Sequence, residues 1–214
     1  MSSGNSIDGR RPVPAAIFRH DAGEGALRLP NGRRVIALAA PLLQHLHAAL
    51  HETLGETARE VLYRIGYEWA LQDMLRLHQR LKNEFVTGDF DFWRLDPKLA
   101  INAWWSPFRL NGWGALTLEL SAFARGLAFV ELHDSAVALA MPDAKRPACH
   151  LYAGLFAGAM SFFTRAERHA VEIECRAMHA ERCRFVVGPG AEVDSAEVWR
   201  QQGTAAAEIV RRLG

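Results

Sequence analysis

The sequence predicts an α+β domain in which an antiparallel sheet is flanked by helices. Two patterns in the 214 residues predict it. In several long segments apolar residues recur every three or four positions, which is typical of a helix with one buried face. Short β-like runs bounded by turn residues lie between these segments, and the clearest, residues 169–175, alternates apolar and acidic side chains. Antiparallel pairing is the simplest arrangement for such runs.

The composition narrows the class of protein. Half of the residues are hydrophobic and 23% are charged, which favours a globular chain with a sizeable core. Lys plus Arg number 25 and Asp plus Glu 24, so no strong field would attract nucleic acid, and we expect none as a partner. The longest weakly polar stretch, residues 151–164, is shorter than the roughly 20 residues of a membrane span. The N-terminus lacks the apolar core of a secretion signal, and we therefore expect a cytoplasmic location.

The first 24 residues show neither helical nor strand periodicity, which predicts a flexible N-terminal tail. Residues 26–29 and 33–39 then predict two short strands. A tight turn at Asn31 and Gly32 would join them, because Asn-Gly accommodates the positive φ that such turns need.

Two helices are predicted next, over residues 41–54 and from residue 57 to about 85. Gly66 lies inside the second helix, where glycine costs about 1 kcal/mol. Either another backbone or a ligand approaches it, or the helix simply tolerates it. His47 and His51 share one face of the first helix, but no carboxylate or cysteine completes a metal site there, so we expect this face to be solvated. The buried face of that helix is expected to carry Leu42, Leu43, Leu46, Ala49 and Leu50.

The middle of the chain is aromatic and then β-like. A helix is predicted at about residues 97–105. Residues 115–120, 127–130 and 135–141 predict successive antiparallel strands, and a polar loop follows at residues 142–147.

The last third of the chain predicts two further helices and two strands. A helix over residues 148–165 carries Gly154 and Gly158 on one side, where they would permit a neighbouring element to approach closely. A strand at residues 184–187 follows the one at 169–175, and an Ala-rich helix is predicted from Glu192 to Leu213. These elements give a main domain at residues 25–190 and a C-terminal helical segment at residues 191–214.

The three cysteines all lie in this last third. An odd number and a cytoplasmic location argue against structural disulfides. Cys175 and Cys183 bracket a polar loop, so their thiolates can converge on one ion, and Cys149 at a helix start could supply a third sulfur. Zinc typically takes four such ligands. The spacing leaves the fourth ligand open among Glu172, His179 and His150.

Two stretches carry a family resemblance: YAGLFAGAMSFF, beginning at Tyr152, and VEIECRAMHAERCRFVVG, ending at Gly188. Together they resemble the vinyl-4-reductase domain, which is found alone and as the effector-sensing part of bacterial phenol- and xylene-responsive activators. The signature is E-x-x-C followed eight residues later by C-x-F, preceded by a helix that starts with another cysteine. The resemblance implies a structural zinc site near the C-terminal end, because three thiolates and a carboxylate leave no open position for catalysis. Its implied ligands are Cys149, Glu172, Cys175 and Cys183.

The resemblance also implies an apolar ligand cavity between the sheet and the helices. In the phenol sensors a histidine and a tryptophan orient the ligand hydroxyl, whereas Phe108 and Leu132 stand at about those places here. Neither can form such a bond, so a phenol is not the expected ligand. Glu131 and His133 are nearby polar candidates. The implied ligand-binding residues are Trp104, Trp105, Phe108, Trp113, Phe129, Tyr152, Phe156 and Met160.

We therefore expect a stand-alone, zinc-containing domain that binds a small hydrophobic or aromatic molecule as a sensor or carrier. The resemblance implies a homodimer. The alternative is a protein of tetrapyrrole metabolism, either a bacteriochlorophyll 4-vinyl reductase or its pigment-binding accessory. The sequence has no motif for nicotinamide, flavin or an iron–sulfur cluster, which favours a binding protein over a reductase.

Overall fold

The computed structural model describes residues 18–29, 32–85 and 91–214. These residues fall into two compact units, one before and one after the boundary between Leu38 and Ala39. In the first unit, β1 (Arg19–Asp21), β2 (Ala26–Arg28) and β3 (Arg34–Val35) form a three-stranded antiparallel sheet in that order. β1 corrects the prediction of a featureless tail up to residue 24. The Asp21 side chain accepts a hydrogen bond from the backbone N–H of Glu24 at 3.0 Å, which closes the turn between β1 and β2. Residue 31 of the predicted Asn-Gly turn lies outside the described residues.

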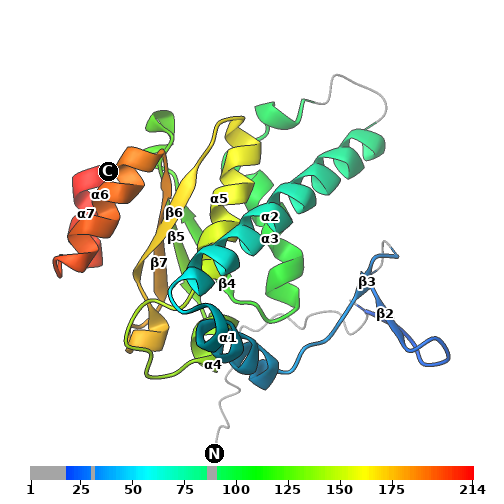
Figure 1. Cartoon of the computed structure of the whole chain (residues 1–214). Helices are drawn as coiled ribbons and strands as arrows, with labels where there is room; N and C mark the ends of the chain where they lie inside the picture. Colours follow the sequence, from blue (N-terminus) through cyan, green and yellow to red (C-terminus); the bar gives the residue numbers. More distant parts are fainter. Residues whose placement is uncertain (1–17, 30–31, 86–90) are drawn as a thin grey trace, which may run out of the picture. The chain divides into compact units, whose positions relative to one another are not determined.

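The second unit is built on a four-stranded sheet and confirms the α+β prediction. Its strands are β4 (Ala115–Glu119), β5 (Ala128–His133), β6 (His169–Glu174) and β7 (Cys183–Gly188). They lie in the order β4-β5-β7-β6, and all neighbours are antiparallel. Figure 1 shows helix α5 (His150–Thr164) on one face of this sheet, and α6 (Gly190–Gln201) with α7 (Ala206–Leu213) on the other.

Helix α5 is buried on nearly all sides, because it lies between the sheet and the long helix α2 (Thr57–Glu84). Glycines allow this arrangement. A Cβ atom on Gly154 would overlap the carbonyl oxygen of Tyr63 in α2, and one on Gly66 would overlap the carbonyl oxygen of Leu151 in α5. The close approach predicted at Gly154 is therefore confirmed, and of the alternatives left open for Gly66 the structure supports the approach of another backbone. The cause at both glycines is a helix–helix crossing.

Two short 3₁₀ turns and two helices flank the aromatic part of the core. They are η1 (Phe92–Arg94), α3 (Pro97–Leu110), η2 (Phe123–Arg125) and α4 (Ala136–Ala140). The Asp96 side chain caps α3 by accepting a hydrogen bond from the N–H of Leu99 at 2.8 Å. α3 continues five residues past the predicted end at residue 105.

The prediction of a strand at residues 135–141 is wrong, because α4 occupies this segment. The Ser135 hydroxyl accepts a hydrogen bond from the N–H of Ala138 at 3.1 Å and so provides the N-cap of α4.

Helix α1 (Ala40–Leu54) corrects a second prediction. Its single buried residue is His47, whereas Leu42 and Leu46 are about half exposed, at 51% and 49%. α1 packs against α4 and α2 through the face that carries His47. Hydrophobic periodicity identified an apolar face but could not identify the neighbours that cover a helix.

The C-terminal segment forms two helices where one was predicted. Gly203 adopts a left-handed conformation, with φ of 82°, and separates α6 from α7. Both helices pack on the sheet through a second core cluster that includes Val193, Ile209 and Leu213. As expected, no helix among the described residues is long and apolar enough to cross a membrane.

Candidate metal centre and aromatic core

Four buried side chains from three neighbouring elements converge at one end of the sheet. Cys149 is the N-cap residue of α5, Glu172 lies in β6, Cys175 directly follows β6, and Cys183 begins β7. Their candidate ligand atoms all lie within 4.8 Å of one another. The structure thus brings together the four residues that the resemblance implied. Of the other candidates for the fourth ligand, His179 is exposed and lies 3.2 Å from Asp143, and His150 is outside the group.

A β-bulge makes this convergence possible. Glu172 and Cys175 are three residues apart, and in a regular strand an odd spacing places side chains on opposite faces. The pairing of β6 with β7 shifts between Glu172 and Glu174, which adds one residue to β6. Glu174 therefore reaches Arg184 on the outer face, while Cys175 is buried beside Cys183.

The spacing of the sulfur atoms suits a tetrahedral metal site. The Sγ atoms of Cys149 and Cys183 are 3.6 Å apart, and all three cysteines are free. Zinc–thiolate bonds of about 2.3 Å place tetrahedral sulfur ligands about 3.8 Å apart. The backbone N–H of Arg176 lies 3.4 Å from the Cys183 Sγ, and the Ser135 hydroxyl lies 3.5 Å from the Cys149 Sγ. These two donors would partly compensate the charge of the thiolates.

Only one of the two carboxylate oxygens of Glu172 accepts a hydrogen bond. Its Oε2 accepts a hydrogen bond from the backbone N–H of Cys149 at 2.9 Å, whereas its buried Oε1 has no hydrogen-bond partner within the described chain. A buried acceptor without a partner is costly. A cation held by Glu172 and the three thiolates would remove this cost, so the residues fit a metal ion.

Burial opposes negative charge in this cluster. Desolvation raises the pKa of Cys149 and the pKa of Glu172 well above their usual ranges, and the neighbouring Cys175 raises both further. Hydrogen bonds from Cys149 and Cys183 lower the pKa of Cys175 instead. The cluster by itself can therefore carry little negative charge. A divalent cation would displace the remaining protons, as metal binding at thiolate sites does.

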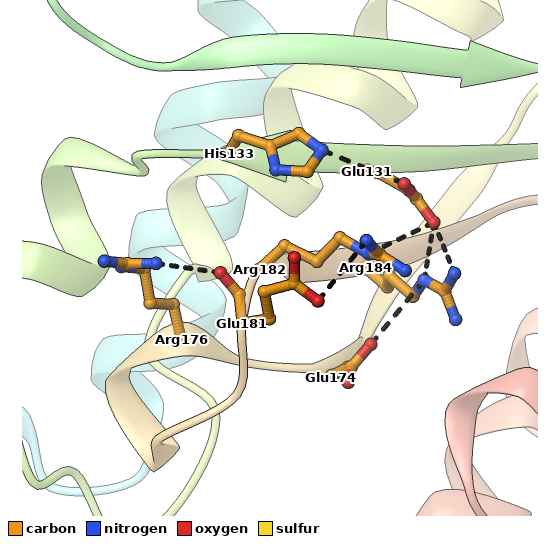
Figure 2. A network of polar contacts seen from close by, with 7 residues as sticks. All are labelled: Glu131, His133, Glu174, Arg176, Glu181, Arg182 and Arg184. Atoms are coloured by element: carbon orange, nitrogen blue, oxygen red, sulfur yellow. Dashed lines mark hydrogen bonds and ion pairs between the residues drawn. The ribbon is translucent and has the colours of Figure 1, made fainter.

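On the other face of the sheet, a charged network surrounds the loop between β6 and β7 (Figure 2). The Arg184 Nε donates to Glu131 at 2.7 Å, and the Arg182 Nε lies 3.3 Å from the same carboxylate. Arg176 donates to the carbonyl oxygen of Glu181 at 2.8 Å and closes the loop that contains η3 (Arg176–Met178). Glu131 and His133, the polar ligand candidates, both lie in this network and not in the aromatic core.

Seven of the eight implied ligand-binding residues share one core cluster between the sheet, α5 and α3. The rings of Trp105 and Phe108 stack at 4.8 Å, and Phe156 lies 5.4 Å from Trp105. The Tyr152 hydroxyl donates to the carbonyl oxygen of Trp113 at 2.5 Å. Two further rings join this cluster, because Trp69 lies 5.2 Å from Phe108 and Phe185 lies 5.0 Å from Phe156. The sequence pattern gave no ligand-site role to Phe185.

Phe129 is the exception, because it belongs to the core cluster on the opposite face of the sheet. There it lines a pocket of about 160 Å³ beside α7. The other residues around this pocket are Thr117, Glu119, Val130, Glu131, Arg184, Phe185 and Val210.

Comparisons with known proteins agree with this arrangement. Residues 128–189, which include all four residues of the metal cluster, match the family model of the vinyl-4-reductase domain. This match confirms the resemblance found in the sequence for this segment of the chain.

Three solved structures are similar to the chain. The phenol-responsive sensory domain of the transcription activator PoxR, crystallised with phenol, has a TM-score of 0.60 at 22% identity, over 85% of this chain and 89% of that one. A trafficking protein particle complex subunit 3 from Naegleria fowleri, covalently bound to palmitic acid, has a TM-score of 0.49 at 10% identity, over 70% of this chain and 93% of that one. A vinyl-4-reductase family protein from Methanocaldococcus jannaschii has a TM-score of 0.36 at 14% identity, over 63% of this chain and 95% of that one. No curated protein matches the chain.

Proposed function

We propose that this chain is a ligand-binding domain that takes a small aromatic molecule into the core between the sheet, α3 and α5. The observation that carries the proposal is the aromatic cluster around Trp105, in which rings from both helices and from Trp113 meet. Small-molecule sites are lined mainly by apolar and aromatic side chains with few polar groups. The fold shared with the phenol-responsive sensory domain of PoxR, crystallised with phenol, supports a small aromatic molecule as the ligand.

The ligand is expected to lack the hydroxyl group of phenol. Phe108 and Leu132 occupy the places where the resemblance puts the two hydroxyl-orienting residues, and both are buried in the core cluster. A buried hydroxyl without an acceptor is unfavourable. Sensing and carrying are both compatible with such a site. The tetrapyrrole alternative gains no support from the comparisons.

Native mass spectrometry of freshly purified protein tests this function. It reports any co-purified ligand, and titration with a panel of substituted benzenes measures affinity directly. Saturable binding with quenching of Trp fluorescence would support the proposal. Binding of a porphyrin but of no small aromatic would favour the tetrapyrrole role.

We further propose that Cys149, Glu172, Cys175 and Cys183 hold a structural zinc ion. Zinc would supply folding energy there and no catalysis, because the four ligands close its coordination sphere. The same mass spectrum should show one zinc per chain in a homodimer. A bare polypeptide mass after purification without chelator would overturn the zinc assignment.

A further inference from the structure

The indole N–H of Trp104 is a buried donor without a partner. Trp104 lies in α3 and is 3% exposed, and its Nε1 has no hydrogen-bond acceptor among the described residues. The next residue provides a contrast. Trp105 is equally buried, at 2% exposed, but its Nε1 donates to the carbonyl oxygen of Gly114 at 3.0 Å. Adjacent tryptophans of the same helix thus differ in whether the indole donor is satisfied.

An unsatisfied donor in a core needs an explanation. Native proteins pair the large majority of buried polar atoms, and exceptions mark functional sites or places that hold water. The neighbouring rings of Trp105 and Phe108 are tilted by 56° to Trp104, with centroids 5.5 and 5.3 Å away. An N–H contact to such a ring is much weaker than a hydrogen bond to oxygen.

We infer that Trp104 is the residue that orients the bound ligand, and that the ligand carries a hydrogen-bond acceptor on an otherwise apolar aromatic body. Aryl ketones, aldehydes and ethers belong to this class. The inference rests on the proposed function and adds the ligand's polar chemistry to it. The site offers a donor at Trp104, while Phe108 and Leu132 offer no side-chain acceptor for a ligand hydroxyl. The acceptor of the ligand would satisfy the indole, which favours this class over hydrocarbons of equal size.

The test uses two probes that differ only in the acceptor. Acetophenone and α-methylstyrene have the same connectivity and nearly the same size, but a C=O group in the first replaces a C=CH₂ group in the second. Their affinities are measured by calorimetry for the wild type, Trp104→Phe and Trp105→Phe. Taking the ratio of the two affinities within each protein cancels the loss of ring volume, as in a double-mutant cycle.

We expect Trp104→Phe to shift the ratio against acetophenone by about tenfold relative to the wild type, which is the contribution of one buried hydrogen bond. Trp105→Phe should leave the ratio unchanged, because its N–H is already bonded within the protein. An unchanged ratio in Trp104→Phe would overturn the inference and leave aromatic binding intact. If the wild type binds neither probe, the inference fails together with the proposed function.

A measurement without ligand keeps the test independent of affinity. Both variants lose the same ring volume from the core, and they differ in whether a hydrogen bond within the protein is lost with it. Trp105→Phe should be the less stable variant, since it also leaves the Gly114 carbonyl oxygen without its donor. If Trp104→Phe is destabilised as much, then the Trp104 N–H has a partner in the free protein and the premise is wrong.

Discussion

Whether a residue of β7 belongs to the metal cluster depends on the face of the sheet to which its side chain points. Cys183 is fully buried, and the following residue, Arg184, joins the charged network on the outer face. A slip of one residue in the pairing of β7 would exchange these environments. The register of β7, which pairs Glu172 with Phe185 and Leu132 with Cys183, therefore determines whether the cluster exists.

Replacing Cys183 with serine should release the metal ion and lower the free energy of unfolding by about 3–5 kcal/mol, as expected for loss of a structural metal. Serine is a poor zinc ligand, and the remaining buried groups would lose their shared cation. Metal content by mass spectrometry and the thermal midpoint measure both effects. His179→Ala is the matched control, because this residue of the same loop is exposed and lies outside the cluster. Full zinc content and an unchanged midpoint in Cys183→Ser would contradict the assignment.

His47 should make stability depend on pH. Burial, with a smaller contribution from the nearby His51, lowers the pKa of His47 from 6.5 to about 4. The unfolded chain binds this proton more readily than the folded protein. The contribution of His47 to the free energy of unfolding is therefore fully present above about pH 6.5 and is lost as the pH drops towards 4. Between pH 7.5 and 5.5 the loss from this residue should be about 1 kcal/mol.

Urea denaturation of the wild type and of His47→Gln at the two pH values measures this effect. Acid also protonates metal ligands, but it does so equally in both proteins, so the difference between them isolates His47. His45→Gln, on the exposed side of the same helix, should behave as the wild type. Equal pH dependence in all three proteins would show that His47 does not titrate in this range.

Among the elements, the crossing of α2 and α5 leaves the least space. Gly154→Ala places a Cβ atom against the carbonyl oxygen of Tyr63, and backbone cannot move aside as a flexible side chain can. The helices must separate, and we expect a loss of about 2–3 kcal/mol in unfolding free energy. Gly190→Ala is the control, since its Cβ would meet only His169 at 3.5 Å, an ordinary contact. A Gly154→Ala protein as stable as the control would mean that the crossing is looser than described.

Local sequence patterns predicted the elements well where a single pattern dominated. α2, α5 and β6 were found from periodicity alone, and the spacing of the cysteines indicated a shared ion. The segment of α4 has the apolar pattern of a strand, but one hydrogen bond from the N–H of Ala138 to the Ser135 hydroxyl starts a helix there. The division between α6 and α7 depends on the conformation of one glycine within an Ala-rich run.

The sequence analysis groups Phe129 with the aromatic residues of the ligand site, whereas its side chain joins the core cluster on the α7 side of the sheet. Ala128, Phe129 and Val130 are all buried, so the start of β5 does not alternate between apolar and polar side chains. The signal lies further along the strand, because Glu131 and His133, two and four residues on, share the side of Phe129 and belong to the outer charged network. The bulge in β6 depends on pairing with β7, and only that pairing brings Glu172 and Cys175 to the same side.

At the scale of the molecule, the metal cluster and the charged network hold the same part of the sheet from opposite faces. The cluster joins α5, β6 and β7 from inside, and Glu131 joins β5 to β7 from outside. The aromatic core continues from the cluster along α5, since Tyr152 and Phe156 follow Cys149 on that helix. Loss of metal is thus expected to loosen the ligand site as well as the loop.

Residues 39–214 should fold and bind metal without the first unit. Both core clusters, the four candidate metal ligands and the charged network lie entirely within these residues. Because removing residues 1–38 deletes none of these contacts, the thermal midpoint of the shortened protein should stay within a few degrees of the full chain. Circular dichroism during heating and native mass spectrometry would measure the midpoint, the zinc content and the oligomeric state together. Full zinc in a monomer would place the expected dimer contact in the first unit. A shortened chain that fails to fold would show that the two units form one cooperative structure.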